Sequence, residues 1–467
     1  MTSSTGVLVL GGGPGGYAAA FAAADLGLDV TLVDDAPNPG GVCLYRGCIP
    51  SKTLLHVAAL LRDAEAAAAH GVAFGRPTID LDALRRHKDA VVARLTGGLG
   101  QLCRQRKVRF VQGRGRFLGP HLLAVDAASG GEEIAFENAI VATGSEPRTL
   151  DELAAQGDLV WDSTAALELR EVPGRLLVVG GGYIGVELAS VYLALGSEVT
   201  IVEVTQGLLP GVDPELVRPL LQSLKGRARL MFGTSVTALE RTGDGLMVTL
   251  TAAQGGTESL AVDRVLSSVG RRPRTEGIGL EALGLAPDAQ GFLPVDRERR
   301  TALGHVFAIG DVAGQPMLAH KASHEGRVAA EVIAGRPAAF DPAAIPAVVF
   351  SDPEIAWAGL MEQDAAERGV DVRIGRFPWA ASGRALTLGR SDGLTKIVAE
   401  RASGRILGVG LTGPGAGELI AEGVLAIELG AVAEDVARTI HPHPTLSETV
   451  MEASEGVFGH AAHYYGR

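Results

Sequence analysis

Apolar and glycine-rich stretches follow one another in the same order at two places in the chain. The first place begins with the apolar residues 7–10, continues through a glycine-rich turn at 11–16 and ends with the apolar residues 30–33. The second has its apolar runs at 176–179 and 199–202, with glycines from residue 180 onward. Short apolar runs bounded by glycine predict buried strands, and the small and apolar residues after each turn predict a helix. The pattern therefore predicts two strand–turn–helix–strand units of an α/β fold.

The glycines of both turns have the spacing Gly-x-Gly-x-x-Gly. They are Gly11, Gly13 and Gly16 in the first unit and Gly180, Gly182 and Gly185 in the second. An acidic residue ends the following strand in each unit, Asp34 in the first and Glu203 in the second. Such glycines allow a tight turn and a close approach of a pyrophosphate, and the acid can bond an adenosine ribose. The two units therefore predict two bound dinucleotides.

Two of the three cysteines, Cys43 and Cys48, have four residues between them and follow a glycine pair. Pro50 and Lys52 come next, at the start of a helix that we expect over residues 51–61. Four intervening residues let the two sulfur atoms meet, and a helix N-terminus stabilises a thiolate on Cys48. We therefore interpret the pair as a redox-active dithiol rather than as two buried structural cysteines.

The rest of the composition narrows the class of protein. The length of 467 residues suggests roughly three domains of about 150 residues each. A net charge of −12 gives no basic footprint for nucleic acid or an anionic membrane. No Lys or Arg precedes Arg46, so the apolar N-terminus does not read as a secretory signal, and the expected location is the cytoplasm. No second cysteine pair supplies further ligands, so we expect no metal site.

The position of the dithiol assigns the dinucleotides. The first unit runs directly into the Cys43/Cys48 segment, so its ligand must carry a redox group that reaches the sulfur atoms, which favours FAD. In the second unit the carboxylate of Glu203 repels a 2′-phosphate, and residues 204–206 contain no arginine to receive one. The second unit is therefore expected to bind NAD in preference to NADP.

The remaining segments predict further strands and helices. A long helix over residues 79–106 includes Cys103, which we expect to be a packing residue. Residues 108–117 and 122–125 read as strands, 139–147 as a strand with a turn leading out of it, and 319–333 as a helix. Asp311 ends a strand over residues 305–311, where it can bond the ribityl chain of a flavin or cap a helix. After Pro342, strands and helices alternate irregularly, which indicates a separate α+β domain.

His443 is the candidate general base. Prolines flank it at positions 442 and 444 and fix its backbone, and Glu448 lies five residues later, within reach to orient the imidazole. A single histidine is more often structural, but a dithiol enzyme requires a base. We therefore expect His443 and Glu448 to act as base and orienting acid.

In these features the chain resembles the pyridine nucleotide-disulfide oxidoreductases, and within that family the lipoamide branch. The resemblance covers nearly the whole chain. Besides the two glycine units and the dithiol segment, it is carried by residues 142–145, Glu187, and residues 270–273, 308–311, 317–321, 377–385 and 443–445. The sequence Cys-Ile-Pro-Ser-Lys at 48–52 and the stretch 377–385 best distinguish this branch from the glutathione reductase branch.

The resemblance implies an α/β protein with two Rossmann-like dinucleotide-binding domains and a C-terminal α+β dimerisation domain. The implied domains are an FAD-binding domain at 1–147, an NAD-binding domain at 148–270, a central domain completing the FAD site at 271–341 and a dimerisation domain at 342–467. It also implies a homodimer in which His443 and Glu448 of one subunit complete the active site of the other.

The resemblance further implies roles for individual residues. Cys43 exchanges with the substrate, Cys48 lies against the flavin, and Lys52 pairs with Glu187 near the flavin. The implied FAD-binding residues are Gly11, Gly13, Gly16, Asp34, Lys52, Gly115, Thr143, Gly144, Ser145, Asp311 and Ala319. The implied NAD-binding residues are Gly180, Gly182, Gly185, Glu187, Glu203, Val236 and Gly270.

The activity implied by the resemblance is oxidation of protein-bound dihydrolipoamide to lipoamide with NAD⁺. Its partners are then the lipoyl domains and the acyltransferase core of a 2-oxo acid dehydrogenase complex, or a glycine cleavage complex. The short stretch before the first strand suggests that no lipoyl domain is attached. Two alternatives stay open, a reductase of another small disulfide such as glutathione and a docking subunit of a multienzyme complex. The pair Tyr45-Arg46 replaces the branch's usual Asn-Val between the cysteines and leaves the substrate and flavin potential open.

Overall fold

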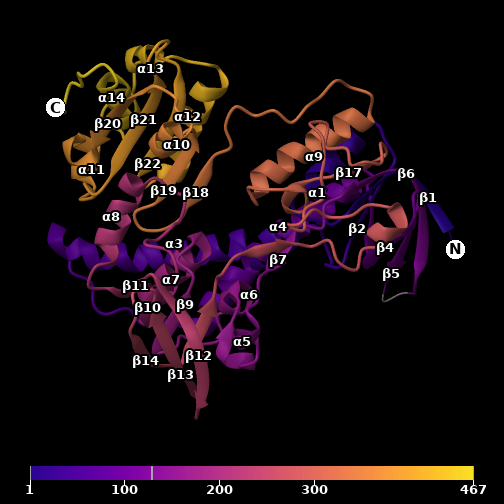
Figure 1. The fold of residues 1–467 in the computed structure, drawn as a ribbon, viewed down its shortest axis with the longest axis horizontal. Helices are drawn as coiled ribbons and strands as arrows, with labels where there is room; N and C mark the ends of the chain where they lie inside the picture. Colours follow the sequence, from indigo (N-terminus) through magenta and orange to yellow (C-terminus); the bar gives the residue numbers. More distant parts are fainter. Residues whose placement is uncertain (1, 128–129, 466–467) are drawn as a thin grey trace.

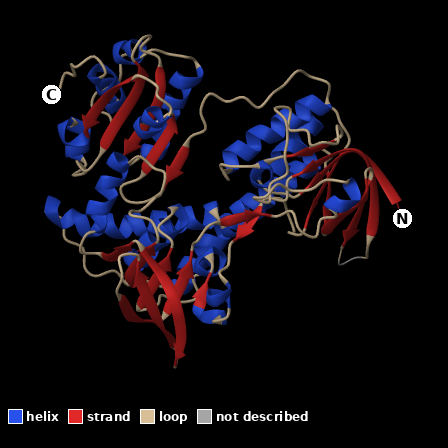
Figure 2. Cartoon of the chain, in the orientation of Figure 1, coloured by secondary structure: helices blue, strands red, loops and turns tan. Residues whose placement is uncertain are grey.

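The computed structural model describes residues 2–127 and 130–465, so the outermost residues of the first and last predicted domains lie outside it. Figure 1 shows three groups of elements, one around β1, one around β9 and one around β22, with the C-terminal end in the last. In Figure 2 each group contains sheet strands with helices packed beside them, which is the mixed α/β architecture expected from the sequence. No helix of the described part is long and apolar enough to cross a lipid bilayer.

The first sheet has the strand order β3-β2-β1-β6-β5-β4, and β17 pairs with β6. Its strands are β1 (Thr2–Leu10), β2 (Val30–Asp34), β3 (Arg109–Gln112), β4 (Arg114–Gly119), β5 (Leu122–Asp126), β6 (Glu132–Val141) and β17 (Val306–Ala308). Strands β1, β2, β3, β6 and β17 run parallel, whereas β4 and β5 pair antiparallel at one side. The parallel strands are buried on both faces, which explains why they read as continuous apolar runs.

Five helices carry the predicted site or pack beside this sheet. They are α1 (Pro14–Asp25), α2 (Gly41–Arg46), α3 (Cys48–Ala66), α4 (Leu81–Gln105) and α9 (Ala319–Ile333). Helix α3 begins three residues before its predicted start and ends five residues after its predicted end. Cys103 is buried in the core formed by α1, β1 and their neighbours, as expected for a packing residue.

The second unit forms a parallel sheet of order β11-β10-β9-β15-β8. The strands are β8 (Val160–Trp161), β9 (Arg175–Val179), β10 (Glu198–Glu203), β11 (Ala228–Phe232) and β15 (Arg264–Ser267). Its helices are α5 (Asp151–Ala154), α6 (Ser163–Glu168), α7 (Tyr183–Leu195) and α8 (Pro214–Leu224). A three-stranded antiparallel sheet lies beside it, made of β12 (Thr234–Thr242), β13 (Gly245–Ala252) and β14 (Thr257–Val262). Two short strands, β7 (Ser145–Pro147) and β16 (Arg271–Pro273), pair antiparallel between the two units.

The C-terminal segment forms a separate antiparallel sheet of order β18-β19-β22-β21-β20. Its strands are β18 (Ala347–Val349), β19 (Ile355–Gly359), β20 (Val372–Pro378), β21 (Leu394–Glu400) and β22 (Ile406–Thr412). Its helices are α10 (Glu362–Glu367), α11 (Gly383–Thr387), α12 (Ala416–Glu428), α13 (Ala433–Arg438) and α14 (Glu448–Gly456). The residues between α9 and β18 lead from the first sheet to this one (Figure 1), so the segment after Pro342 is the α+β unit expected from its pattern.

Candidate functional site

The two glycine turns have the same backbone geometry. Gly11 and Gly180 open the turns with φ of +107° and +105°, in the region that favours glycine. A Cβ on Gly16 would lie 1.8 Å from the carbonyl oxygen of Gly11. The equivalent Cβ on Gly185 would lie 2.1 Å from the carbonyl oxygen of Gly180. Each helix therefore starts against its own turn only because these positions lack a side chain.

The middle glycine of each turn faces free space. A Cβ on Gly182 would meet no atom within 4 Å, and one on Gly13 would meet nothing closer than 4.0 Å. Both glycines are the N-caps of their helices, so the free backbone N–H groups of the first helical turn point toward this space. Such a cradle, open above a helix N-terminus, fits the pyrophosphate of a dinucleotide.

The acidic residue of each unit is held by the turn itself. The carboxylate of Asp34 accepts hydrogen bonds from the Gly12 N–H at 2.5 Å and from the Ala36 N–H at 2.9 Å. Glu203 accepts in the same way from the Gly181 N–H at 2.7 Å and the Thr205 N–H at 2.8 Å. Burial raises the pKa of Asp34 above its usual value, against these bonds. Both acids are thus fixed at the mouth of their glycine turn, where a ribose would lie.

The dithiol segment is seated on the first glycine turn. Gly41, the first residue of α2, has φ of +57°, and a Cβ there would lie 2.5 Å from the Cα of Gly13. The Gly40 N–H also donates to the carbonyl oxygen of Gly12 at 2.7 Å. The glycine pair before the cysteines therefore brings the dithiol into contact with the first dinucleotide unit, as the order of the two motifs predicted.

Cys43 lies in α2 and Cys48 is the first residue of α3. Both are free thiols in this structure, and the hydrogen bond between them lowers the pKa of Cys48 to about 7. Burial opposes this shift, while the charge of Lys52 assists it. The same hydrogen bond raises the pKa of Cys43. Cys48 is therefore the sulfur atom that carries negative charge near neutral pH.

Lys52 joins three parts of the chain. Its Nζ lies 2.8 Å and 3.0 Å from the two carboxylate oxygens of Glu187 on α7. It also lies 4.4 Å from the ring centroid of Phe350, whose N–H donates to Glu187 at 3.1 Å. Glu187 is buried, so this ion pair is shielded from solvent on one side. The contact connects the dithiol helix with the second unit and the C-terminal segment.

The carboxyl edge of the first sheet carries a second polar group. Ser145 donates to Asp311 at 2.5 Å, and the Arg271 Nε–H donates to Ser145 Oγ at 2.8 Å. Asp311 lies in the short 3₁₀ turn Gly310–Ala313, eight residues before α9 begins. It does not cap that helix, so the alternative left open by the sequence is decided against a cap. Arg271 was missed as a site residue, although it follows Gly270 in a segment that the sequence did single out.

The remaining predicted residues lie at different places around this edge. Thr143 donates to the Arg274 carbonyl oxygen at 2.7 Å, and Gly144 and Gly270 have positive φ. Ala319 is the first residue of α9, and Val236 lies at a bulge in β12. Gly115 instead contacts the sheet interior, because a Cβ there would meet Leu10 and Leu123. Its structural reason for being glycine is packing.

His443 and Glu448 lie together in the C-terminal segment. His443 Nδ1 is 2.8 Å from Glu448 Oε1, and the Thr445 N–H donates to Glu448 Oε2 at 2.8 Å. Although burial opposes it, these two partners hold the pKa of Glu448 below its usual value. The His443 side chain is 72% exposed, and in the described residues no hydrogen bond joins it to either thiol. The imidazole is thus oriented by one nitrogen and free to accept a proton at the other.

A second histidine of the same segment was missed by sequence reasoning. His441 is largely buried, with Nε2 2.7 Å from Glu422 Oε1 and Nδ1 2.8 Å from the Thr439 carbonyl oxygen. It ties the His443 loop to α12. The pattern His-Pro-His-Pro was the available signal, since Pro442 lies between the two histidines and each histidine is followed by a proline.

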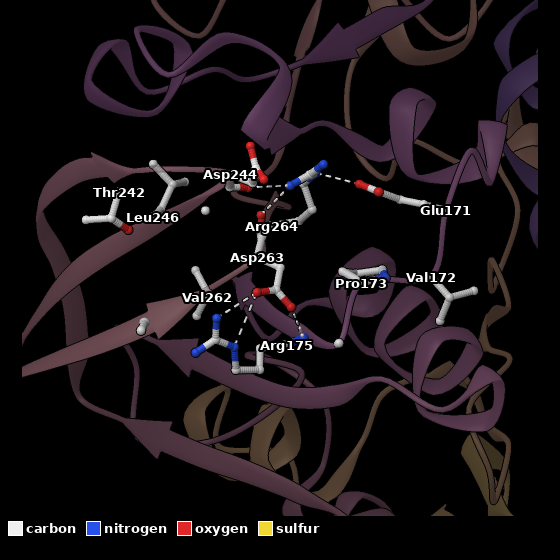
Figure 3. Close-up of a pocket in the computed structure, with 13 residues that line it drawn as sticks. Glu171, Val172, Pro173, Arg175, Thr242, Asp244, Leu246, Val262, Asp263 and Arg264 are labelled. Atoms are coloured by element: carbon white, nitrogen blue, oxygen red, sulfur yellow. Dashed lines mark hydrogen bonds and ion pairs between the residues drawn. The ribbon is translucent and has the colours of Figure 1, made fainter.

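The pocket in Figure 3 is a different place from the redox site. It is lined where β9 begins beside the antiparallel β12–β14 sheet, and no predicted site residue lines it. Its charged side chains are paired with one another: Arg175 lies 2.7 Å from Asp263, and Arg264 lies 2.6 Å from Glu171. Among the described residues, no cluster of His, Cys, Asp or Glu has a metal-binding arrangement. Neither feature adds a catalytic centre.

Known proteins resemble the chain over nearly its whole length. The family model described as pyridine nucleotide-disulphide oxidoreductase matches residues 5–326, and its dimerisation domain matches residues 345–454. A dihydrolipoyl dehydrogenase of Vibrio cholerae is 46% identical over 96% of this chain and 94% of the relative. One of Halobacterium salinarum is 47% identical over 100% of this chain and 99% of the relative.

Solved structures lead to the same group. The crystal structure of LpdA from Mycobacterium tuberculosis is 29% identical, covers 97% of this chain and 99% of its own, and superposes with a TM-score of 0.89. From the family match over residues 5–326 and the full-length relatives, the chain belongs to the pyridine nucleotide-disulphide oxidoreductase family, an oxidoreductase family with FAD and NAD as cofactors.

Proposed function

We propose that this chain oxidises protein-bound dihydrolipoamide to lipoamide with NAD⁺ as the acceptor. The observation that carries the proposal is the contact between the dithiol segment and the first glycine turn, where Gly41 meets Gly13. This contact supports the proposal because an acidic thiol then lies beside the proposed dinucleotide site. Relatives that are 46% and 47% identical over at least 96% of the chain are named dihydrolipoyl dehydrogenase, which favours lipoamide over other disulfides.

The proposal assigns four domains to the chain. Residues 1–147 bind FAD, 148–270 bind NAD, 271–341 complete the FAD site and 342–467 form the dimer interface. FAD is held by the first glycine turn, by the dithiol helix and by the sheet edge. These residues are Gly11, Gly13, Gly16, Asp34, Lys52, Gly115, Thr143, Gly144, Ser145, Asp311 and Ala319. NAD is held by Gly180, Gly182, Gly185, Glu187, Glu203, Val236 and Gly270.

The reaction begins with proton transfer from a substrate thiol. Nε2 of His443 accepts this proton, because Nδ1 is bonded to the Glu448 carboxylate, which keeps that nitrogen protonated. The substrate thiolate then attacks Cys43 of the oxidised Cys43–Cys48 pair. The new substrate–Cys43 bond forms as the Cys43–Cys48 bond breaks, and Cys48 leaves as a thiolate. A pKa of about 7 makes Cys48 a good leaving group.

The second substrate thiol completes the exchange. It attacks its own mixed-disulfide sulfur, so that lipoamide leaves and Cys43 is released with its electron pair and a proton. Two electrons have then passed from the substrate to the cysteine pair. FAD, when bound, supplies the step that carries these electrons on to NAD⁺ as a hydride. The ion pair of Lys52 with Glu187 keeps a positive charge close to the Cys48 thiolate.

The proposed working form is a homodimer. A dimerisation domain matches residues 345–454, and His443 within it is exposed rather than bonded to the thiols of its own chain. His443 and Glu448 of one copy therefore serve the dithiol of the other. The proposed partners are the lipoyl domains and the acyltransferase core of a 2-oxo acid dehydrogenase complex, or a glycine cleavage complex, in the cytoplasm.

The test is a comparison of acceptors and donors with the purified protein. Reduction of lipoamide, oxidised glutathione and other small disulfides is measured with NADH and with NADPH. We expect lipoamide with NADH to turn over faster than every other combination, and a Cys48→Ser variant to be inactive in all of them. Equal turnover of lipoamide and glutathione would overturn the substrate, and a preference for NADPH would overturn the nucleotide.

A further inference from the structure

Three buried charged side chains lie beneath the turn that carries Asp311. Arg299, Lys321 and Glu325 are 9%, 5% and 0% exposed. Lys321 and Glu325 are one helical turn apart on α9, with 3.0 Å between Nζ and Oε1. Arg299 lies 3.6 Å from the same oxygen. Burying charges is costly unless each is paired and hydrogen-bonded, so what this group contacts is informative.

Lys321 and Glu325 on α9 form hydrogen bonds at both ends of the turn that carries Asp311. The Gly310 N–H donates to Glu325 Oε2 at 2.6 Å. Lys321 Nζ donates to the Gly314 carbonyl oxygen at 3.0 Å, and the Gly310 carbonyl oxygen lies 3.5 Å away. The turn Gly310–Ala313 is thus held at its first N–H and at the carbonyl that follows it. Asp311, between these two points, is the residue that accepts from Ser145.

Another face of the same helix fixes the first glycine turn. A Cβ on Gly326 would lie 2.6 Å from the Gly15 carbonyl oxygen, so α9 and α1 touch through their backbones. Ser323 donates to the Pro14 carbonyl oxygen at 3.2 Å. Helix α9 therefore sets the distance between the N-terminus of α1 and the Asp311 turn, which are two sides of the proposed FAD site.

We propose that Lys321 and Glu325 are a positioning pair that fixes the Gly310–Asp311 turn for FAD binding; this rests on the function proposed above. An apolar pair of similar volume fills a core at least as stably as a buried ion pair. It does not, however, accept the Gly310 N–H or donate to the Gly314 carbonyl. The charges are therefore explained by the backbone groups that they hold, and the ligand affected is the flavin dinucleotide.

The test measures FAD affinity of the full-length chain, by adding FAD to apoprotein and following quenching of flavin fluorescence. The variants are Glu325→Gln, Lys321→Met and the double variant. The double variant removes one negative and one positive charge, so the net charge of the buried group stays the same. We expect each to weaken FAD binding about tenfold or more, the usual effect of losing a charged hydrogen bond. NADH affinity is expected to stay within about twofold, because the second unit is untouched.

A matched control is Glu434→Gln, which breaks the exposed i,i+4 pair with Arg438 and should leave FAD affinity unchanged. If a single variant fails to fold, the FAD affinity of the charge-balanced double variant tests the inference. FAD affinity within twofold of the unaltered chain in the double variant would overturn the inference. So would a lower thermal midpoint of the apoprotein with unchanged FAD affinity, because that is a purely structural role. An unaltered chain that binds no FAD would overturn the proposed function as well.

Discussion

The two sulfur atoms of the dithiol differ in pKa because Cys43 lies within α2 and Cys48 lies at the N-terminus of α3. Cys48 starts α3, receives the hydrogen bond of Cys43 and lies near Lys52, so the pKa of its thiol falls to about 7. Cys43 donates that bond and its pKa rises. Tyr45, between them, donates its hydroxyl to the Asn38 carbonyl oxygen at 3.0 Å. The bulky residue between the cysteines is therefore tied to the preceding loop.

Replacing Cys43 by alanine is expected to raise the pKa of Cys48 above its value of about 7. The hydrogen bond from Cys43 is the largest cause of the shift, and without it burial of the thiolate is opposed only by the charge of Lys52 and a backbone hydrogen bond. Alkylation of Cys48 is followed against pH in the reduced apoprotein. Cleavage after Arg46 separates the peptides of the two cysteines.

The third cysteine should not interfere with this measurement. Burial raises the pKa of Cys103 to about 11, so that thiol should stay unmodified. Lys52→Met is the matched variant and should raise the Cys48 pKa by less, since its charge is a smaller cause. An unchanged alkylation midpoint in Cys43→Ala would contradict the hydrogen bond from Cys43 as the main cause of the low Cys48 pKa.

Among the elements, local contacts fix the two glycine turns and the C-terminal tail in position. Each glycine turn brings a helix N-terminus against its strand, at a distance that no side chain permits. The tail after α14 is tied back to that helix by its acidic face. His463 Nδ1 contacts Glu452 Oε1, and the Ala462 N–H donates to Glu455 at 3.1 Å.

Alanine at the last glycine of each turn separates the two dinucleotide sites. Gly16→Ala places a Cβ against the Gly11 carbonyl and should abolish FAD binding, while Gly185→Ala should abolish NADH binding and leave FAD bound. Flavin absorbance and NADH titration measure the two effects. Gly97→Ala is the control, because a Cβ there meets no atom within 4 Å and alanine favours a helix. FAD loss in Gly185→Ala instead would reverse the assignment of the two units.

The tail should loosen as pH rises. The bond to Glu452 raises the pKa of His463 above the ordinary value of about 6.5. A raised pKa means that the protonated bond is fully present below about pH 6.5 and is lost as pH passes through the higher folded value. Limited proteolysis should therefore cut the tail faster at alkaline pH, and His463→Gln should remove this dependence. Because His463 is mostly exposed, the effect is expected to be modest.

In the molecule as a whole, a buried ionic cluster joins the C-terminal sheet to the second unit. Lys396 on β21 is 1% exposed and lies within 2.7 Å of Asp213, Glu215 and Glu362. Asp213 caps α8, whereas Glu362 begins α10 of the C-terminal segment. Arg376 also pairs with Glu215 and Glu362. Five side chains from both segments therefore meet around the buried Lys396 and Asp213, which fixes how the proposed interface domain sits on the proposed NAD domain.

Lys396→Met should weaken this domain contact. Without Lys396 the buried Asp213 carboxylate has no cation, whereas Arg376 still pairs with Glu215 and Glu362. Losing one partner of a buried pair costs about 3 kcal/mol. The thermal midpoint of unfolding should fall by several degrees, with faster proteolysis between the segments. Arg401→Met, which breaks only the exposed pair with Asp371, is the control and should change neither. An unchanged midpoint in Lys396→Met would show that the contact rests on apolar packing.

Acid should weaken the same contact. Although burial opposes it, bonds from Lys396 and Arg376 lower the pKa values of Glu215 and Glu362. Because these two pKa values are lowered, the glutamates stabilise the contact above the ordinary glutamate pKa of about 4.3. This stabilisation is lost as pH falls through their pKa values in the folded protein.

Mixed dimers test whether the active site spans two copies. Cys48→Ser and His443→Gln homodimers should each be nearly inactive, since one lacks the dithiol and the other the base. If His443 serves the opposite dithiol, a mixed dimer carries both defects in one site and none in the other. Mixing the two variants after mild dissociation should then restore lipoamide turnover. No recovery in mixtures that exchange subunits would contradict the shared site.

The sequence already defined much of the fold, because periodicity and turn chemistry are local. The helix expected over residues 319–333 matches α9, and both glycine units have the predicted strands and helices. In strand β20 the alternation of apolar and polar residues is interrupted by Gly375 and Arg376. A Cβ on Gly375 would lie 1.9 Å from the Ala453 carbonyl oxygen. Glycine is required at this position because helix α14 packs across the strand, and no local sequence pattern reveals that contact.

By itself the sequence determined the paired dinucleotide turns, the dithiol beside the first of them and the candidate base with its acid. These depend on residues within one element or its neighbour, where backbone conformation and spacing decide the outcome. Only the tertiary structure decided which distant charges meet. Lys396 and Asp213 are 183 residues apart in sequence and Ser145 and Asp311 are 166 apart, so their contacts follow from how whole helices and strands pack. Packing brings such groups together through apolar burial, which fixes position without leaving a signal at the polar residues themselves.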